Sequence, residues 1–530
     1  MTSGAYPKPS DDGKSAAIAG ASQRLAAPFV RLANAWFDAP NATATAAFLA
    51  MFVLAWTLFQ ELSYASIDLH PDLVEVYAWG RHPSFGYYKH PPLGGLISAL
   101  WFGVFPPRDW AFQLLAMVNA AVGLYATALI ANRYLTGDKR LTVVLLLLLT
   151  PFYQFHGQRF ASNQTLLSTW PVAVYCFLRA FEGRRPGWAV AAGGSAALAM
   201  LGKYYSVFLV VGLAAAALAH PARSAYFRSS SPWISALVGL GCLAPHMAWL
   251  AATGFLPFHY ALAVHSEASL AAVLAGTGAY ALGAVAYVSV LVAAYLLAVR
   301  PDWATVSDAL WPSQPDRRML AVLLWVPLVV PMPVAIVMGV RITPLWTMQA
   351  WFLLPILLLA PAGAVLRRPA AIGVAALVAS ITLGALLASP AIAWIRHVNG
   401  TKEARSYYRL LAVEAAARFQ AATGRPLSIV AGDPLLAVAA TFYAPGHPDA
   451  LPGSDLATAP WITPARLTRE GFAALCKSGD DDCLNRARQI SGERPDAIRA
   501  DIELVPRFLG TDGPPQAFTL LLVPPLPPGR

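Results

Sequence analysis

The sequence predicts an α-helical polytopic membrane protein with a small α/β domain at its C-terminal end. Of the 530 residues, 57% are hydrophobic and only 12% are charged, and the mean hydropathy is +0.52. A chain of this composition cannot present enough polar surface to be an ordinary soluble globule. In addition, long apolar segments recur from residue 44 to residue 396, and charged residues become frequent only after them.

The apolar segments have the length and composition of membrane-spanning helices. We expect spans near residues 44–62, 110–132, 141–156, 164–181, 188–202, 204–219, 233–252, 272–299, 319–340, 346–363 and 370–396. Several are short or interrupted by proline and glycine. The prediction is therefore about eleven spans, and counting the broken segments differently allows up to thirteen.

The distribution of basic residues predicts the orientation of the spans. Arginine pairs such as Arg184 with Arg185 and Arg367 with Arg368 fall in alternate loops, whereas the loop at 253–271 contains no Lys or Arg. Under the positive-inside rule, this asymmetry places residues 1–40 in the cytoplasm as a partly disordered tail, and an odd span count places the C-terminus outside. The net charge of +10 is therefore assigned to topology rather than to nucleic-acid binding.

The division into domains follows from the same analysis. Residues 41–396 form the predicted membrane domain, with a first external loop at 63–109, and residues 397–530 form a periplasmic domain. A helix near 402–422 and strands at 427–431 and 518–523 indicate a mixed α/β fold there.

Two of the four cysteines bear on the location of this domain. Cys476 and Cys483 flank a short polar loop, and a disulfide between them requires an oxidising compartment. Free thiols are the alternative. A zinc site would need further ligands, which the neighbouring sequence lacks.

Chemically reactive residues gather at one predicted membrane boundary. The loop at 63–109 contains Asp72, Glu75 and Lys89, and the outer ends of later spans carry Lys203 and Arg341. Charges at a membrane boundary are costly and are commonly functional. A carboxylate can deprotonate an acceptor hydroxyl, and cations can hold a phosphate leaving group. The set therefore predicts group transfer from a phosphate-bearing donor. No Gly-x-Ser-x-Gly turn supports a hydrolytic triad.

Four motifs carry a resemblance to a known family. They are Asp72 to Glu75, the run Gly86-Tyr-Tyr-Lys-His-Pro-Pro-Leu93, the turn Phe160-Ala-Ser-Asn163, and Lys203-Tyr-Tyr205. Over roughly residues 44–360 the chain resembles membrane glycosyltransferases of the protein O-mannosyltransferase and aminoarabinose-transferase type. The resemblance implies the glycosyltransferase C architecture, a polyprenyl-phosphate-sugar donor, and transfer with inversion at the anomeric carbon.

The resemblance also implies roles for individual residues. Asp72 is the expected catalytic aspartate, and Glu75 is a second acidic residue one helical turn on. We expect the donor phosphate to be bound by Lys89, Lys203 and Arg341, and the substrates by Tyr87, Tyr88, His90, Asn163 and Tyr204. The pattern departs from many relatives because Leu73 follows Asp72 and because Asn163 stands where another acid is common. No metal ligands are assigned, and a requirement for a divalent metal is left open.

The predicted function is transfer of a sugar to a lipid or cell-envelope glycan, such as lipid A or its core, at the periplasmic face of a bacterial inner membrane. A protein acceptor is the alternative within the same enzyme class. A lipid or sugar transporter is the alternative of another class. It is disfavoured because the charges lie at one boundary and no inverted pair of broken segments is evident. Each charged residue also has a structural alternative: Lys89 and Lys203 can reach lipid headgroups, and Asp72 can cap a helix.

Overall fold

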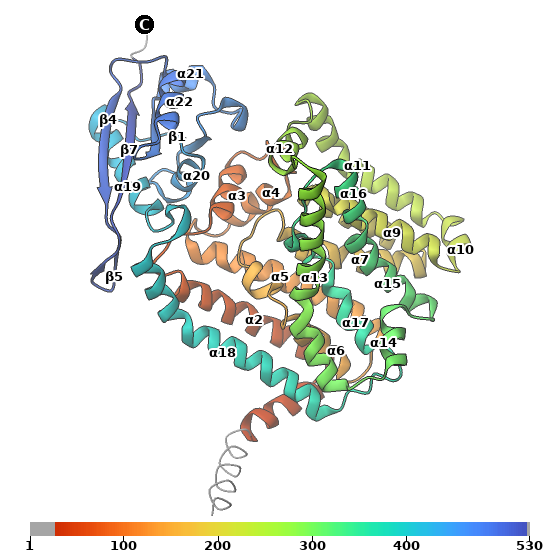
Figure 1. Ribbon diagram of the computed structural model, residues 1–530. Coiled ribbons are helices and arrows are strands. Elements are labelled where there is room, and N and C mark those ends of the chain that lie inside the picture. Colours follow the sequence, from red (N-terminus) through yellow and green to blue (C-terminus); the bar gives the residue numbers. More distant parts are fainter. Residues whose placement is uncertain (1–26, 527–530) are drawn as a thin grey trace, which may run out of the picture.

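A large bundle of helices with a small α/β domain at one end forms the fold (Figure 1). The computed structural model describes residues 27–526. Residues 27–38 are helical. Of the predicted cytoplasmic tail, residues 1–26 lie outside the described part of the chain.

Within the described residues, six helical segments are long and apolar enough to cross a membrane. They are α2 (Asn41–Ser63), α5 (Asp109–Tyr134), α11 (Ser231–Ala252), α13 (Leu270–Val299), the pair α15 (Pro315–Val329) and α16 (Pro331–Met338), and α18 (Arg368–Asn399). Each coincides with a span expected from the sequence.

The remaining expected spans are also helical, but they are shorter or broken. They comprise α6 (Lys139–Leu147) with the π-helix η1 (Phe152–His156), α7 (Thr165–Gly183), α8 (Pro186–Gly202), η2 (Tyr204–Ser206) with α9 (Val207–Ala219), and η3 (Pro344–Thr347), η4 (Trp351–Leu353) and α17 (Leu354–Leu359). Prolines explain some of the breaks, because Pro151 and Pro344 lack the N–H that a continuous helix requires. Three short connecting helices are α10 (Arg223–Phe227), α12 (Leu256–His265) and α14 (Trp303–Leu310).

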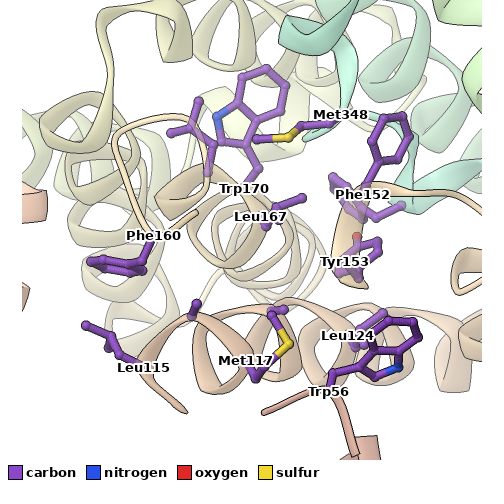
Figure 2. Close-up of a cluster of buried hydrophobic side chains, with 14 of the residues drawn as sticks. Trp56, Leu115, Met117, Leu124, Phe152, Tyr153, Phe160, Leu167, Trp170 and Met348 are labelled. Atoms are coloured by element: carbon purple, nitrogen blue, oxygen red, sulfur yellow. The ribbon is translucent and has the colours of Figure 1, made fainter. Parts of the chain in front are cut away.

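Large buried side chains fill the centre of the bundle. Figure 2 shows Trp56 of α2, Met117 and Leu124 of α5, and Trp170 of α7 in this core. The backbones of α5 and α7 approach closely at Gly123, where a Cβ atom would lie 2.0 Å from the carbonyl oxygen of Leu167. Only glycine permits this approach. The close contact fixes α7 and the turn before it, which carries Asn163.

Two helices lie across the end of the bundle beside the α/β domain: α3 (Pro71–Arg81) and α4 (Leu93–Phe102) (Figure 1). The first begins with a strong start signal, because Pro71 occupies its first position and His70 Nδ1 accepts a hydrogen bond from the Asp72 N–H at 3.2 Å. Gly80 of α3 faces the backbone of α4, where a Cβ would lie 2.9 Å from the Ala99 nitrogen. This packing holds the loop between the two helices in place.

The C-terminal domain is built on a five-stranded sheet with the order β2-β1-β3-β7-β4. The strands are β1 (Ile429–Gly432), β2 (Asp449–Pro452), β3 (Phe472–Lys477), β4 (Ile498–Leu504) and β7 (Gln516–Val523). The β1 strand pairs in parallel with β2 and β3, and β7 pairs antiparallel with β3 and β4. The short strands β5 (Arg507–Phe508) and β6 (Thr511–Asp512) form a separate hairpin.

Helices cover both faces of this sheet. They are η5 (Lys402–Ala404), α19 (Tyr408–Thr423), α20 (Pro434–Tyr443), η6 (Leu456–Thr458), α21 (Pro464–Glu470) and α22 (Asp481–Ser491). Alternate residues of β3 point to opposite sides: Ala473 and Leu475 join the main core, whereas Phe472 and Cys476 pack with Leu484 of α22. Cys476 and Cys483 are buried and joined by a disulfide.

The C-terminal domain forms hydrogen bonds with the segment that leads into α3. The backbone N–H of Leu69 donates to the Tyr443 hydroxyl at 2.8 Å. The Arg405 guanidinium donates to the Asp68 carbonyl at 2.8 Å, and the Arg409 backbone N–H donates to the Asp68 carboxylate at 3.0 Å. Burial raises the pKa of Asp68 to about 6, although the Arg409 N–H and guanidinium oppose the rise.

The raised pKa of Asp68 predicts a pH dependence of stability. The folded chain binds this proton more tightly than the unfolded chain, for which the ordinary pKa is 3.8. The resulting stabilisation is full below about pH 4 and is lost as the pH rises through about 6. From pH 7 to pH 5 the wild type should therefore gain about 1 kcal/mol relative to Asp68→Asn. Unfolding of both proteins at the two pH values measures this difference, and a constant difference contradicts the assignment.

The disulfide predicts where the C-terminal domain resides. Because we expect the domain outside the cytoplasm, Cys476 and Cys483 should be disulfide-bonded in the native membrane. The bond should stabilise the domain by about 2–3 kcal/mol. Peptide mapping under non-reducing conditions detects the bond. A membrane-impermeant thiol reagent, applied to spheroplasts before and after reduction, reports the side. Free thiols that react only after lysis would place the domain in the cytoplasm.

Candidate functional site

Asp72 is an accessible carboxylate at the N-terminal end of α3. Its side chain is 51% exposed, whereas much of the helix behind it is buried. His70 lies 3.5 Å away, from Nδ1 to the Asp72 carboxylate. Burial lowers the pKa of His70 to about 4, with the charges of Arg159 and Arg405 adding to the effect against that of Asp72. His70 is therefore neutral at pH 7, and Asp72 has no cationic partner on that side.

Glu75 and Lys89 form a partly buried ion pair one turn further along α3. Lys89 Nζ lies 2.7 Å from Glu75 Oε1, and the Tyr88 hydroxyl donates to the same oxygen at 3.2 Å. Burial by itself would lower the pKa of Lys89, but the Glu75 carboxylate and the neighbouring tyrosines raise it above its usual range. Lys89 thus remains protonated. The rings of Tyr88, Tyr260 and Trp79 surround its ammonium group at 5.4–5.9 Å.

Lys203 follows α8 and enters the same region from the bundle. Its ammonium group donates to the Asn163 side-chain oxygen and lies 4.4 Å from the ring of Trp346. The charge of Lys203 interacts with that of Asp72. Residues from α3, from the turn before α7 and from the segment after α8 therefore converge.

Arg341 lies at the edge of this group. Its side chain is 58% exposed and its Nε is 3.5 Å from Glu267 Oε1. The Arg341 backbone N–H donates to the His265 carbonyl at 2.8 Å, and the His265 ring packs against Trp346 at 5.2 Å. His265 and Trp346 thus connect Arg341 to Lys203.

The expected substrate-binding residues occupy different positions. His90 lies among cations: burial, followed by the charges of Lys203, Lys89 and His265, holds its pKa well below the usual range, so its imidazole is neutral. Tyr204 donates or accepts a hydrogen bond with His246 at 3.2 Å. Tyr87 is buried, stacks on Trp79, and donates to the Trp79 carbonyl at 2.9 Å. Tyr87 therefore supports the loop from inside.

Three aromatic or histidine neighbours were not assigned to the site from the sequence. They are Trp346, His265 and Tyr260. Their contacts with Lys203 and Lys89 come from segments far apart in the chain. No local motif signals such contacts, although the sequence places Trp346 five residues after Arg341.

The arrangement separates one accessible carboxylate from two lysine amines, of which Lys89 is protonated. Asp72 is accessible, whereas Glu75 is engaged by Lys89. Lys89 has three N–H donors, and its pair with Glu75 leaves others for an anionic group. An oxyanion placed between Lys89 and Lys203 would be stabilised, and Asp72 can accept a proton beside it. Among the described residues, no cluster of three or more Asp, Glu, His or Cys side chains could hold a metal ion.

Comparisons with known proteins agree with this architecture. Residues 89–249 match the family model described as dolichyl-phosphate-mannose-protein mannosyltransferase. The fold is similar to that of ArnT from Cupriavidus metallidurans bound to undecaprenyl phosphate, with a TM-score of 0.55 and 14% identity over 90% of this chain and 97% of that one. The apo structure of the same protein gives 0.54 and 13%, covering 91% and 98%. No curated protein sequence matches the chain.

The matched segment contains Lys89, Asn163 and Lys203, and the structural similarity extends over the bundle and the C-terminal domain. The expected fold class is confirmed: a multispan helical bundle with a small C-terminal sheet domain. The chain therefore shares the fold of ArnT, and its residues 89–249 are similar to the mannosyltransferase family.

Proposed function

We propose that the protein is an inverting glycosyltransferase that uses a polyprenyl-phosphate-sugar donor. The observation that carries the proposal is the convergence of one accessible carboxylate, Asp72, with two partly buried lysines. Both lysines lie in the segment that matches a glycosyltransferase family model. The similarity to a protein bound to undecaprenyl phosphate supports the choice of donor.

In the proposed reaction, Asp72 takes the proton of an acceptor hydroxyl while the oxygen of that hydroxyl attacks the anomeric carbon of the donor sugar. The bond from that carbon to the phosphate oxygen breaks, and polyprenyl phosphate leaves with the bonding electrons. Lys89 and Lys203 hold the phosphate charge, and Arg341 approaches from the exposed edge. Attack from the face opposite the leaving group inverts the anomeric configuration.

Glu75 has a supporting role in this mechanism. Its carboxylate accepts hydrogen bonds from Lys89 and Tyr88, so it orients the lysine toward the donor phosphate. Asn163 orients Lys203 in the same way. His90, neutral between the two lysines, can donate or accept a hydrogen bond without repelling either substrate.

We place the reaction at the outer face of a bacterial inner membrane, with a lipid or cell-envelope glycan as acceptor. A protein acceptor is the second candidate, because the matching family model is that of a protein mannosyltransferase. Transfer assays with the purified protein, comparing envelope lipids with peptides as acceptors, discriminate between the two. A transporter is disfavoured because the paired charges lie at one end of the bundle beside α3.

Replacing Asp72 with Asn should abolish most of the activity. The change preserves size but removes the proton acceptor, so turnover should fall by roughly two to four orders of magnitude. The side chain is half exposed, so the thermal transition should be unchanged. As a comparison, Glu75→Gln should mainly weaken donor binding, because Lys89 then loses the carboxylate that orients it toward the donor phosphate. Near-normal turnover of Asp72→Asn in a transfer assay would exclude Asp72 as the base.

Replacing either lysine should weaken donor binding. We expect Lys89→Ala and Lys203→Ala each to raise the dissociation constant for a polyprenyl-phosphate-sugar, and Arg at either position to restore affinity only partly because the guanidinium is planar. Lys139→Ala is the matched control, since Lys139 begins α6 away from α3. Titration of the donor measures all variants. Unchanged affinity in both Ala variants would assign the lysines a structural role.

A further inference from the structure

A polar cavity lies between the membrane bundle and the C-terminal domain, next to α3. Its volume is about 350 Å³, and its wall is formed by the end of α2, the segment before α3, the start of α5, α19 and the β5 strand. Its charged lining residues are Glu61, Asp68, Asp109, Arg409 and Arg507. None of them has a role in the proposed reaction.

The charges in this cavity do not balance. Arg409 is engaged by two carboxylates, with 2.8 Å to Asp109 and 3.5 Å to Asp68. Arg507 is engaged by Asp512 at 2.5 Å. Glu61 has no ion-pair partner within residues 27–526, and its Oε1 is buried without a hydrogen bond. The wall therefore carries an excess of negative charge.

A second observation points to a ligand. Gln113 is only 3% exposed and lines the cavity, and within the described chain its Oε1 has no hydrogen-bond donor. Buried polar groups without partners are rare and destabilising. Glu61 and Gln113 are both acceptors, so the missing partner is a group that presents hydrogen-bond donors to a negative environment.

The cavity is close to the proposed base. Asp68 in its wall precedes Asp72 by four residues, which limits their separation to about 14 Å along the chain. Tyr64 and Gln113 also line a small void of about 20 Å³ whose wall includes His70, and His70 contacts Asp72. The ion pair between Lys89 and Glu75 lies one helical turn further along α3.

We propose that this cavity binds the acceptor, and that the acceptor presents hydroxyl or protonated amine groups to it rather than phosphate. Glu61 and Gln113 accept its hydrogen bonds, and the excess negative charge repels phosphorylated sugars. This inference rests on the proposed glycosyltransferase function, because it assigns the second substrate of that reaction.

Three probes that differ only at carbon 6 test the charge preference: methyl glucoside, methyl 6-amino-6-deoxyglucoside and methyl glucoside 6-phosphate. Their affinities are measured by calorimetry on the full chain in phosphatidylcholine nanodiscs. We expect the amine to bind about tenfold more tightly than the glucoside, as one charge-assisted hydrogen bond implies, and the phosphate to bind most weakly. Equal affinities, or tightest binding of the phosphate, would overturn the proposal.

Variants of the cavity residues test whether the sugar probes bind in the cavity. Glu61→Gln should remove most of the tenfold preference for the amine, and Gln113→Leu should weaken binding of both the amine and the glucoside. Glu503→Gln, an exposed carboxylate of β4, is the control and should leave all affinities unchanged. If Gln113→Leu does not fold, Glu61→Gln alone decides, and a preference that survives in Glu61→Gln contradicts the site.

Failure of the cavity assignment can be distinguished from failure of the proposed glycosyltransferase function. If the wild type transfers no sugar from any polyprenyl-phosphate donor but keeps the Glu61-dependent preference, the cavity is a binding site and the enzyme assignment fails. If transfer occurs and the preference is absent, only the cavity assignment fails.

Discussion

The ion pair between Lys89 and Glu75 is the interaction on which the rest of the site depends. A lysine so nearly buried beside a membrane bundle must keep its charge against desolvation, and the carboxylate at 2.7 Å allows it to do so. The same pair removes Glu75 from competition with Asp72 for protons and substrate. One contact therefore fixes a cation in the loop after α3 and leaves Asp72 as the accessible carboxylate on this helix.

The C-terminal domain positions the helix that carries both acids. At the start of α3, Tyr443 and the arginines of residues 405 and 409 bind the segment containing Asp68. At its end, His82 Nε2 lies 2.7 Å from the buried Asp449 carboxylate, which Arg466 also contacts at 3.0 Å. Because α3 is held at both ends, the small domain and the bundle form a single support for the site.

The sequence predicted the helical bundle well because hydropathy is a local signal. Every expected span contains helix, although several spans are broken. The structure brings Lys203 into contact with Asn163. The sequence could not predict that Tyr87 faces inward, since it shares one motif with Tyr88 and only the packing of Trp79 distinguishes them. Nor could it find the roles of Trp346 or Gln113, because their partners lie on elements distant in the chain.

The charge distribution around α3 gives a physical reason for keeping two substrates apart. A phosphate is attracted to Lys89 and Lys203 and is repelled from the cavity in which Glu61 has no ion-pair partner among the described residues. A donor that carries phosphate and an acceptor that carries hydroxyls or amines would therefore bind to different groups of residues without competing. In the proposed reaction, the accessible Asp72 takes the proton of the acceptor oxygen. The separation of positive and negative charges at this end of the bundle would direct the donor and the acceptor to different binding places.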